Sequence, residues 1–133
     1  MGHLAHGGGG KVILAFMSEK ETEAVLRTLP KGIHKAALMA ELAAIRRDKF
    51  WVSQSEIFDG AVGIFAPYFD NANHVVGSIG VFGPELRFDE ARIVKVTRGV
   101  LESAAELSSA LGQVSARQIQ RPAAREKGRA QSS

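Results

Sequence analysis

A run of four glycines, Gly7 to Gly10, followed by Lys11 is the first feature of the chain that could do chemistry. A glycine-rich segment ending in Lys is typical of phosphate-binding loops, in which backbone N–H groups cradle the phosphates and a hydroxyl binds magnesium. That pattern, G-x4-G-K-[ST], needs a glycine at position 5 and a hydroxyl at position 12. The chain has Ala5 and Val12 there, so a nucleotide-binding loop is not predicted.

The same glycines allow a second interpretation. If a helix begins near Gly10, the backbone N–H groups of Gly8, Gly9 and Gly10 could hold a carboxylate, because the first N–H groups of a helix have no partner within it. Glycine also lets a ligand approach the backbone closely. Judged from the residues alone, a plain flexible loop remains the simpler interpretation.

Other polar residues form no catalytic or metal-binding set. Glu56 and Asp59 could work as an acid–base pair, yet carboxylates at this spacing also simply flank turns. His3 and His6 would give at most half of a metal coordination shell, with no nearby carboxylate to complete it. We therefore predict no catalytic residue, no metal site and no cofactor.

Composition limits the class of protein. The chain has 133 residues, of which 45% are hydrophobic, which suits one ordinary globular domain. It contains no Cys, which excludes disulfides and thiolate metal sites and is typical of a reducing cytoplasm. We also see no apolar run of membrane-spanning length and no secretory signal, so a cytoplasmic protein without membrane partners is expected.

The positive charge is concentrated at one end of the chain. Residues 1–116 contain 12 Lys or Arg against 13 Asp or Glu, a balance of −1, whereas residues 117–133 contain 5 against 1, a balance of +4. A folded nucleic-acid-binding surface gathers basic residues on the packed domain itself. Direct nucleic-acid binding by the body of the chain is therefore not expected.

Local signals predict three helices. Ser18 and Glu21 form a capping-box pattern, which predicts a helix over about 19–28. Apolar residues recur at helical spacing within AALMAELAAIRRD, residues 36–48. Asp89 can cap a last helix that runs to about Leu111 with Gly112 at its C′ position. The segment KVILAFM, residues 11–17, suits a buried strand or a buried helix equally well.

Between these helices the pattern is typical of strands. Three strands are predicted at about 50–53, 60–68 and 74–82, with the turn sequence DNAN before the third. Their many glycines indicate bulges, or a face where something approaches the backbone closely. The result is an α+β domain with helices packed on an antiparallel sheet. We expect a domain over 1–112 and a disordered basic tail over 113–133.

Four segments, in their order and amino-acid sequence, resemble the C-terminal effector-binding domain of the IclR family of bacterial transcriptional regulators. The segments are GKVILAFMSEKE, ELAAIRRDKFWVSQSE, GAVGIFAPYFDNANHVVGSIGVFGP and LRFDEARIVKV followed by LESAAELSSALG. The resemblance runs from about Gly7 to Gly112, and the family signature is carried by Ser53, Glu56, Ile64, Phe69, Asp70, Gly83 and Pro84. It implies a GAF-like or profilin-like fold, an organic-acid sensor that is not an enzyme, a homo-oligomer, and a helix beginning in the glycine run.

The resemblance also implies a ligand site. In the family the effector's carboxylate meets the glycine-rich helix start, and side chains from the sheet complete the pocket. The corresponding positions here are Gly8, Gly9, Gly10, Ser53, Ala61, Gly63, Gly80 and Phe82. Gly63, Gly80 and Phe82 stand where polar residues are common, so an apolar or aromatic acid is expected to fit better than a small hydroxy- or oxo-acid.

Several positions depart from the family pattern. Lys49 stands where the family has Gly or Ala, Gly63 where it has Cys, Ser or Ala, Phe65 where it has a small residue, and Tyr68 where it has an aliphatic one. These differences concern the chemistry of the pocket more than the fold.

Family members also carry a winged helix-turn-helix domain and further strands before the glycine run, and this sequence includes neither. We therefore expect operator DNA to be reached only through an N-terminal domain absent from this chain, and the sheet to have open edges that favour self-association. Two alternatives remain: a small acid–base enzyme using Glu56 and Asp59, and an interaction fragment that pairs with full-length regulators and poisons their oligomers.

Overall fold

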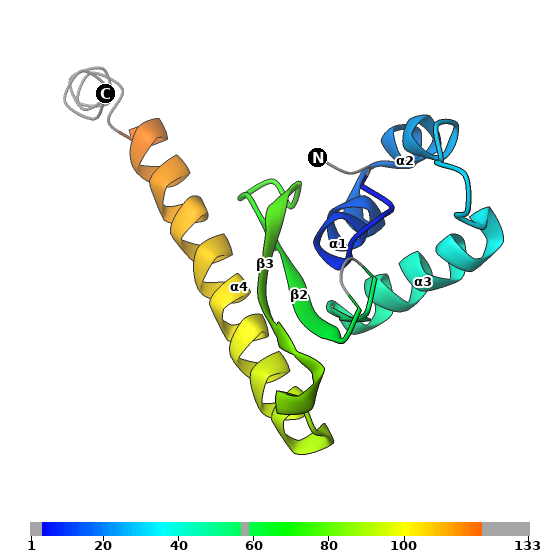
Figure 1. The fold of residues 1–133 in the computed structure, drawn as a ribbon. Helices are drawn as coiled ribbons and strands as arrows, with labels where there is room; N and C mark the ends of the chain where they lie inside the picture. The colour runs from blue at the N-terminus through cyan, green and yellow to red at the C-terminus, as the bar shows by residue number, and fades with distance from the viewer. Residues whose placement is uncertain (1–3, 57–58, 121–133) are drawn as a thin grey trace, which may run out of the picture.

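The chain folds into an α+β domain, as predicted, in a computed structural model that describes residues 4–56 and 59–120 (Figure 1). Three antiparallel strands lie in the order β1-β2-β3. The elements in chain order are α1 (Gly8–Phe16), α2 (Glu19–Leu26), α3 (Lys35–Asp48), β1 (Trp51–Gln54), β2 (Ala61–Phe69), β3 (Val75–Pro84), a 3-10 turn (Glu85–Arg87) and α4 (Glu90–Gln120).

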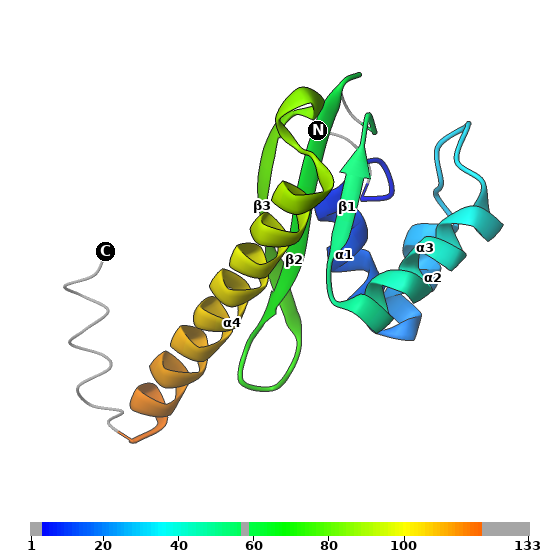
Figure 2. The ribbon, with the colours of Figure 1, turned by 90° about the horizontal axis from the view of Figure 1, so that it is seen from below.

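The two faces of the sheet are covered by different helices. Along β2, Val62, Ile64 and Ala66 point to one side, where they form a core with Val100 and Ala104 of α4. The opposite face lies under α1, and Figure 2 shows α1 between the sheet and α3. Because strand side chains alternate between faces, each face of β2 serves a separate layer.

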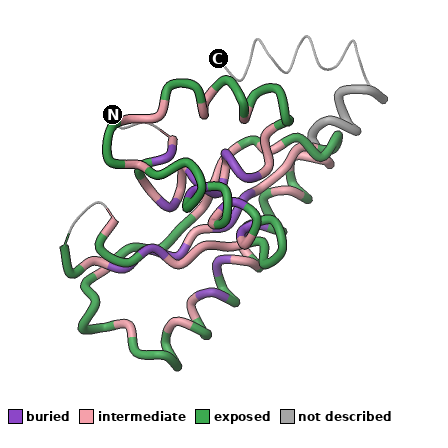
Figure 3. The backbone as a smooth tube through the Cα atoms, turned by 90° about the vertical axis from the view of Figure 1, so that its right-hand side faces the viewer, coloured by how far each residue is buried: buried purple, intermediate pink, exposed green. Residues whose placement is uncertain are grey.

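The second core lies between α1 and α3. Its buried members come from both helices and from the segment before α1, and Figure 3 shows that buried stretches of the chain lie toward the middle of the fold. They are Ala5, Val12, Leu14, Ala15, Leu38, Leu42 and Ile45. Residues 11–16 of the KVILAFM segment are therefore helical, because Val12, Leu14 and Ala15 are buried in a helix that packs against α3 on one side and the sheet on the other.

Local capping signals place two helix starts where the sequence predicts them. The Ser18 side chain accepts a hydrogen bond from the Glu21 N–H, and the Glu21 carboxylate accepts one from the Ser18 N–H. These hydrogen bonds hold the pKa of Glu21 below its usual value. At α4, Asp89 accepts from the N–H of Arg92, which confirms Asp89 as its cap.

The predicted end of the last helix is wrong. α4 continues through Gly112 to Gln120, so Gly112 is not a C′ residue and residues 113–120 are helical rather than disordered. A single glycine weakens a helix by only about 1 kcal/mol relative to alanine, which the flanking helix formers can offset. The rest of the predicted tail, 121–133, lies outside the described residues.

The end of α3 and the β2–β3 turn each depend on the backbone or side chain of one residue. Lys49 ends α3 in the left-handed region with φ 70°, a conformation in which glycine is the usual residue. In the β2–β3 turn, the Asp70 carboxylate accepts hydrogen bonds from the N–H groups of His74 and Ala72, and these lower its pKa. The DNAN prediction of a turn is therefore confirmed.

Candidate functional site

The sheet face under α1 brings together residues from three strands around Phe65. In the antiparallel register Phe65 lies opposite Gly80, and Gly63 lies opposite both Ser53 and Phe82. All of these residues are on the α1 side of the sheet, because strand neighbours at even spacing share a face. The Phe65 ring is half-buried between this face and the start of α1.

The start of α1 lies over this sheet face and approaches the same ring. A Cβ added at Gly8 would lie 2.7 Å from Cδ2 of Phe65 and 3.0 Å from the Cβ of Ser53. A Cβ added at Gly9 would lie 3.1 Å from the Ser78 hydroxyl and 3.5 Å from the ring. Only glycine allows α1 to sit so close to the sheet, which gives the glycine run a structural role.

The predicted site residues divide into two groups. Gly8, Gly9, Ser53, Gly63, Gly80 and Phe82 converge around Phe65. Gly10 does not face the ring: a Cβ added there would overlap the Leu4 carbonyl. Ala61 lies on the same sheet face but at the start of β2, opposite Pro84.

The N-terminus of α1 has the electrostatics of an anion site. Among the described residues, no side chain caps the helix at Gly7, whose carbonyl accepts the first intrahelical hydrogen bond from Lys11 at 2.9 Å. The N–H groups of the first turn and the positive end of the helix dipole therefore favour a negative group at this end. The first turn also contains no acidic residue that would compete for those N–H groups.

Beside this face lies a buried ion cluster that the sequence analysis missed. The Lys11 ammonium, with a side chain only 9% exposed, contacts Glu56 Oε2 at 2.6 Å and Glu41 Oε1 at 3.1 Å. The Trp51 indole donates to the second oxygen of Glu56 at 2.8 Å, and Lys11 stands 5.5 Å from the centre of the Trp51 ring. The only sequence signal was a lone Lys at the head of an apolar segment.

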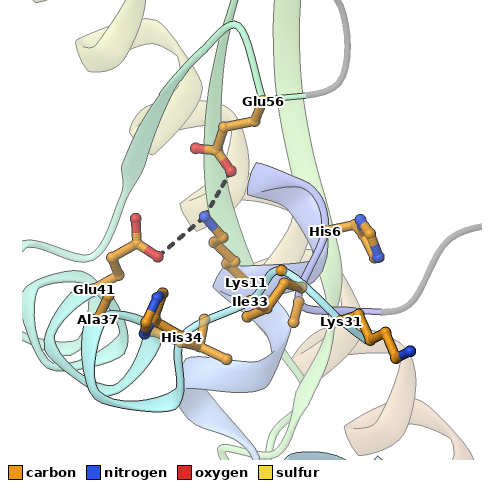
Figure 4. Close-up of a pocket in the computed structure, with 11 residues that line it drawn as sticks. His6, Lys11, Lys31, Ile33, His34, Ala37, Glu41 and Glu56 are labelled. Carbon is orange, nitrogen blue, oxygen red and sulfur yellow. Dashed lines mark hydrogen bonds and ion pairs between the residues drawn. The ribbon is translucent and has the colours of Figure 1, made fainter. Parts of the chain in front are cut away.

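The cluster borders an open cleft of about 440 Å³ next to the α2–α3 loop (Figure 4). His6, Lys31 and His34 stand around its other sides. Both oxygens of Glu56 are engaged by Lys11 and Trp51, while Asp59 is exposed. A carboxylate held in this way serves the packing of α1 against β1 and α3 rather than acid–base chemistry.

Comparison with known sequences shows which protein family the chain belongs to. Residues 2–109 match the protein family described as "Bacterial transcriptional regulator IclR C-terminal". The chain is 32% identical over 108 residues to the HTH-type transcriptional regulator BhcR of Paracoccus denitrificans, an alignment that covers 76% of this chain and 39% of that protein. The chain belongs to the IclR family, and it corresponds to the family's C-terminal effector-binding domain.

Solved structures share the fold of this chain. The IclR of Thermotoga maritima has a TM-score of 0.76 at 30% identity, covering 82% of this chain and 47% of that one. The C-terminal domain of E. coli KdgR has a TM-score of 0.74 at 24% identity, covering 82% of this chain and 71% of that domain. The chain thus spans about two fifths of the length of BhcR and less than half of the T. maritima protein.

Family membership decides between a sensing domain and an acid–base enzyme. The IclR family consists of transcriptional regulators that are not enzymes, so the alternative of an acid–base enzyme using Glu56 and Asp59 is not supported. The buried ion cluster supplies the physical reason for Glu56. Across residues 4–56 and 59–120, no helix is both long and apolar enough to cross a membrane.

Proposed function

We propose that this chain senses a small organic acid on behalf of a DNA-binding regulator, whose contact with operator DNA is made by a winged helix-turn-helix domain outside this sequence. The observation that supports this most directly is the convergence of the start of α1, which no described side chain caps, with Gly63 and Gly80 of the sheet. The helix end attracts a carboxylate, and the glycine-rich face accepts an apolar body. The protein acts in the cytoplasm, where such acids and operator DNA are found.

The walls around this site favour an apolar or aromatic acid. Gly63, Gly80 and Phe82 add no hydrogen-bonding side chain, while Ser53 lies beside Gly8 and the Ser78 hydroxyl beside Gly9 at the start of α1. A sensing domain works by binding its effector with different affinity in two states of the regulator. With such walls, the ligand's carboxylate is the group that the site recognises by polar contacts.

Gly9→Asp tests the carboxylate position. We expect this variant to bind acids at least about tenfold more weakly than the parent, equivalent to about 1.4 kcal/mol, because the new carboxylate repels the ligand at the helix end. Isothermal titration calorimetry with acetate, pyruvate, phenylacetate and benzoate measures the effect. Gly9→Asn is the matched control, because it adds the same bulk beside Ser78 without the charge.

Two results would count against the proposal. If neither the parent nor any variant binds any of these acids, organic-acid sensing is wrong. If Gly9→Asp and Gly9→Asn bind an acid equally well, the carboxylate does not lie at the start of α1.

We also propose that the chain forms homo-oligomers through its open sheet edges. β1 and β3 are the edge strands, and β3 exposes 42% of Val81 and 51% of Phe82. Unpaired strand edges beside apolar side chains favour pairing with another chain.

Val81→Lys should therefore weaken self-association by about tenfold or more, because a charge on an edge strand opposes pairing. Analytical ultracentrifugation at micromolar concentration measures the change. Leu86→Lys is the control: Leu86 is 99% exposed but lies in the 3-10 turn outside the sheet. A parent chain that sediments as a compact monomer would overturn the proposal.

A further inference from the structure

The ring of Phe65 lies in a chamber lined by four glycines, and it also packs against the core between α1 and α3. Gly8 and Gly9 of α1, Gly63 of β2 and Gly80 of β3 surround it. At Gly8, Gly63 and Gly80 an added Cβ would stand 2.7 Å or less from a ring atom, closer than real Cβ atoms approach their neighbours. Three separate elements thus omit a side chain where this single ring lies.

Both edges of the ring are enclosed. Gly9 and Gly80 face the edge formed by Cδ1 and Cε1, while Gly8 and Gly63 face the edge that includes Cε2. The chamber therefore has the width of one six-membered ring. The Phe65 side chain fills this chamber, which lies where the proposed carboxylate site meets the apolar face of the sheet.

We propose that Phe65 is a built-in occupant that gates the effector chamber: an acid with a single aromatic ring binds where the Phe65 ring now lies, once that ring has swung out. Phe65 is half-buried, so part of the residue already reaches solvent, and the neighbouring Phe82 is 51% exposed. Side chains on strands commonly use two χ1 rotamers, which gives the ring an alternative position.

This gate lowers the apparent affinity of the parent chain. A ligand that competes with an internal side chain binds only the fraction of molecules whose chamber is open, so the apparent Kd rises by the inverse of that fraction. The proposal rests on the proposed sensing function for the identity of the ligand as an acid. It goes further in naming the residue that sets ligand size and the ring that the ligand replaces.

Phe65→Ala tests the gate with benzoate and toluene as probes, both followed by calorimetry and by ligand-observed NMR. We expect Phe65→Ala to bind benzoate at least tenfold more tightly than the parent, and to take up toluene where the parent does not, because apolar cavities of ring size accept such ligands. Phe65→Leu, which retains most of the volume, should show a smaller gain.

Two further variants keep the test decisive. Phe69→Ala removes the ring of the last residue of β2, which packs edge-on against Phe16 at 5.3 Å, and should give no gain in benzoate affinity. If Phe65→Ala fails to fold, Phe65→Val carries the test, since valine suits a strand and still removes the ring.

The outcomes separate the gate from the sensing function. Uptake of toluene without any gain for benzoate would support the chamber and overturn the acid as its ligand. Equal benzoate affinity in the parent and Phe65→Ala, with no toluene uptake by the variant, would overturn the gate even if the parent binds acids elsewhere. A gain of the same size in Phe69→Ala would also overturn it.

Discussion

Replacing Lys11 with methionine is expected to lower the free energy of unfolding by about 3 kcal/mol. The Lys11 ammonium lies between Glu41 and Glu56, and its side chain is 9% exposed. Methionine fills a similar volume but leaves the Glu56 side chain, itself 18% exposed, with Trp51 as its remaining hydrogen-bond donor in the described structure. A buried carboxylate that has lost its cation is costly. Urea denaturation followed by circular dichroism gives the free energies.

A double-mutant cycle separates this pairing from simple loss of the lysine. Lys11→Met combined with Glu56→Gln should cost clearly less than the sum of the two single variants, because the double variant no longer buries an unpaired charge. Lys95→Met is the matched control on the exposed surface of α4, with an expected change within about 0.5 kcal/mol. Additive single effects would show that Lys11 and Glu56 are not coupled.

Gly63→Ala is expected to destabilise the chain by about 2 kcal/mol, through overpacking rather than lost contacts. The added methyl group would lie 2.5 Å from Cε2 of Phe65 and 3.1 Å from a ring carbon of Phe82. Neighbouring Val62 and Ile64 are fully buried on the α4 side, so the strand cannot shift away without disturbing that core. Thermal and urea unfolding measure the loss.

The main cause can be isolated because the closest approach is to one side chain, Phe65. In a Phe65→Ala background the same Gly63→Ala change should cost less than about 0.5 kcal/mol, since the nearest ring is gone. Gly99→Ala is the opposite control: a Cβ there meets nothing within 4 Å among the described residues, and alanine is favoured by about 1 kcal/mol within a helix. An equal cost for Gly63→Ala in both backgrounds would show that Phe65 is not the obstacle.

Short-range signals in the sequence account for most of the secondary structure. The capping box at Ser18, the cap at Asp89 and the alternating pattern around Ile64 each act within one turn or along one strand. Such signals depend on neighbours a few residues apart, which the sequence displays directly. The order and residue content of the four segments also indicated the family, which the family match over residues 2–109 confirms.

The end of α4 shows where a local signal was insufficient. Gly112 has a residue type favoured at C′ positions, yet the helix continues to Gln120. Glycine permits a helix to end without requiring it, since its helical cost is small beside the sum of its neighbours' preferences.

The arrangement of the candidate site was decided by tertiary structure. Lys11 and Glu56 are 45 positions apart, and they meet because α1 packs beside β1, the strand that Glu56 follows in the chain. The Phe65 chamber likewise depends on the β2–β3 register and on how closely α1 approaches the sheet. The sequence by itself determined the family and most of the elements, because those depend on local pattern; the helical state of residues 11–16 and the end of α4 were exceptions. Only packing determined which ring fills the glycine face and which carboxylate pairs with Lys11, because contacts between distant segments are set by their docking.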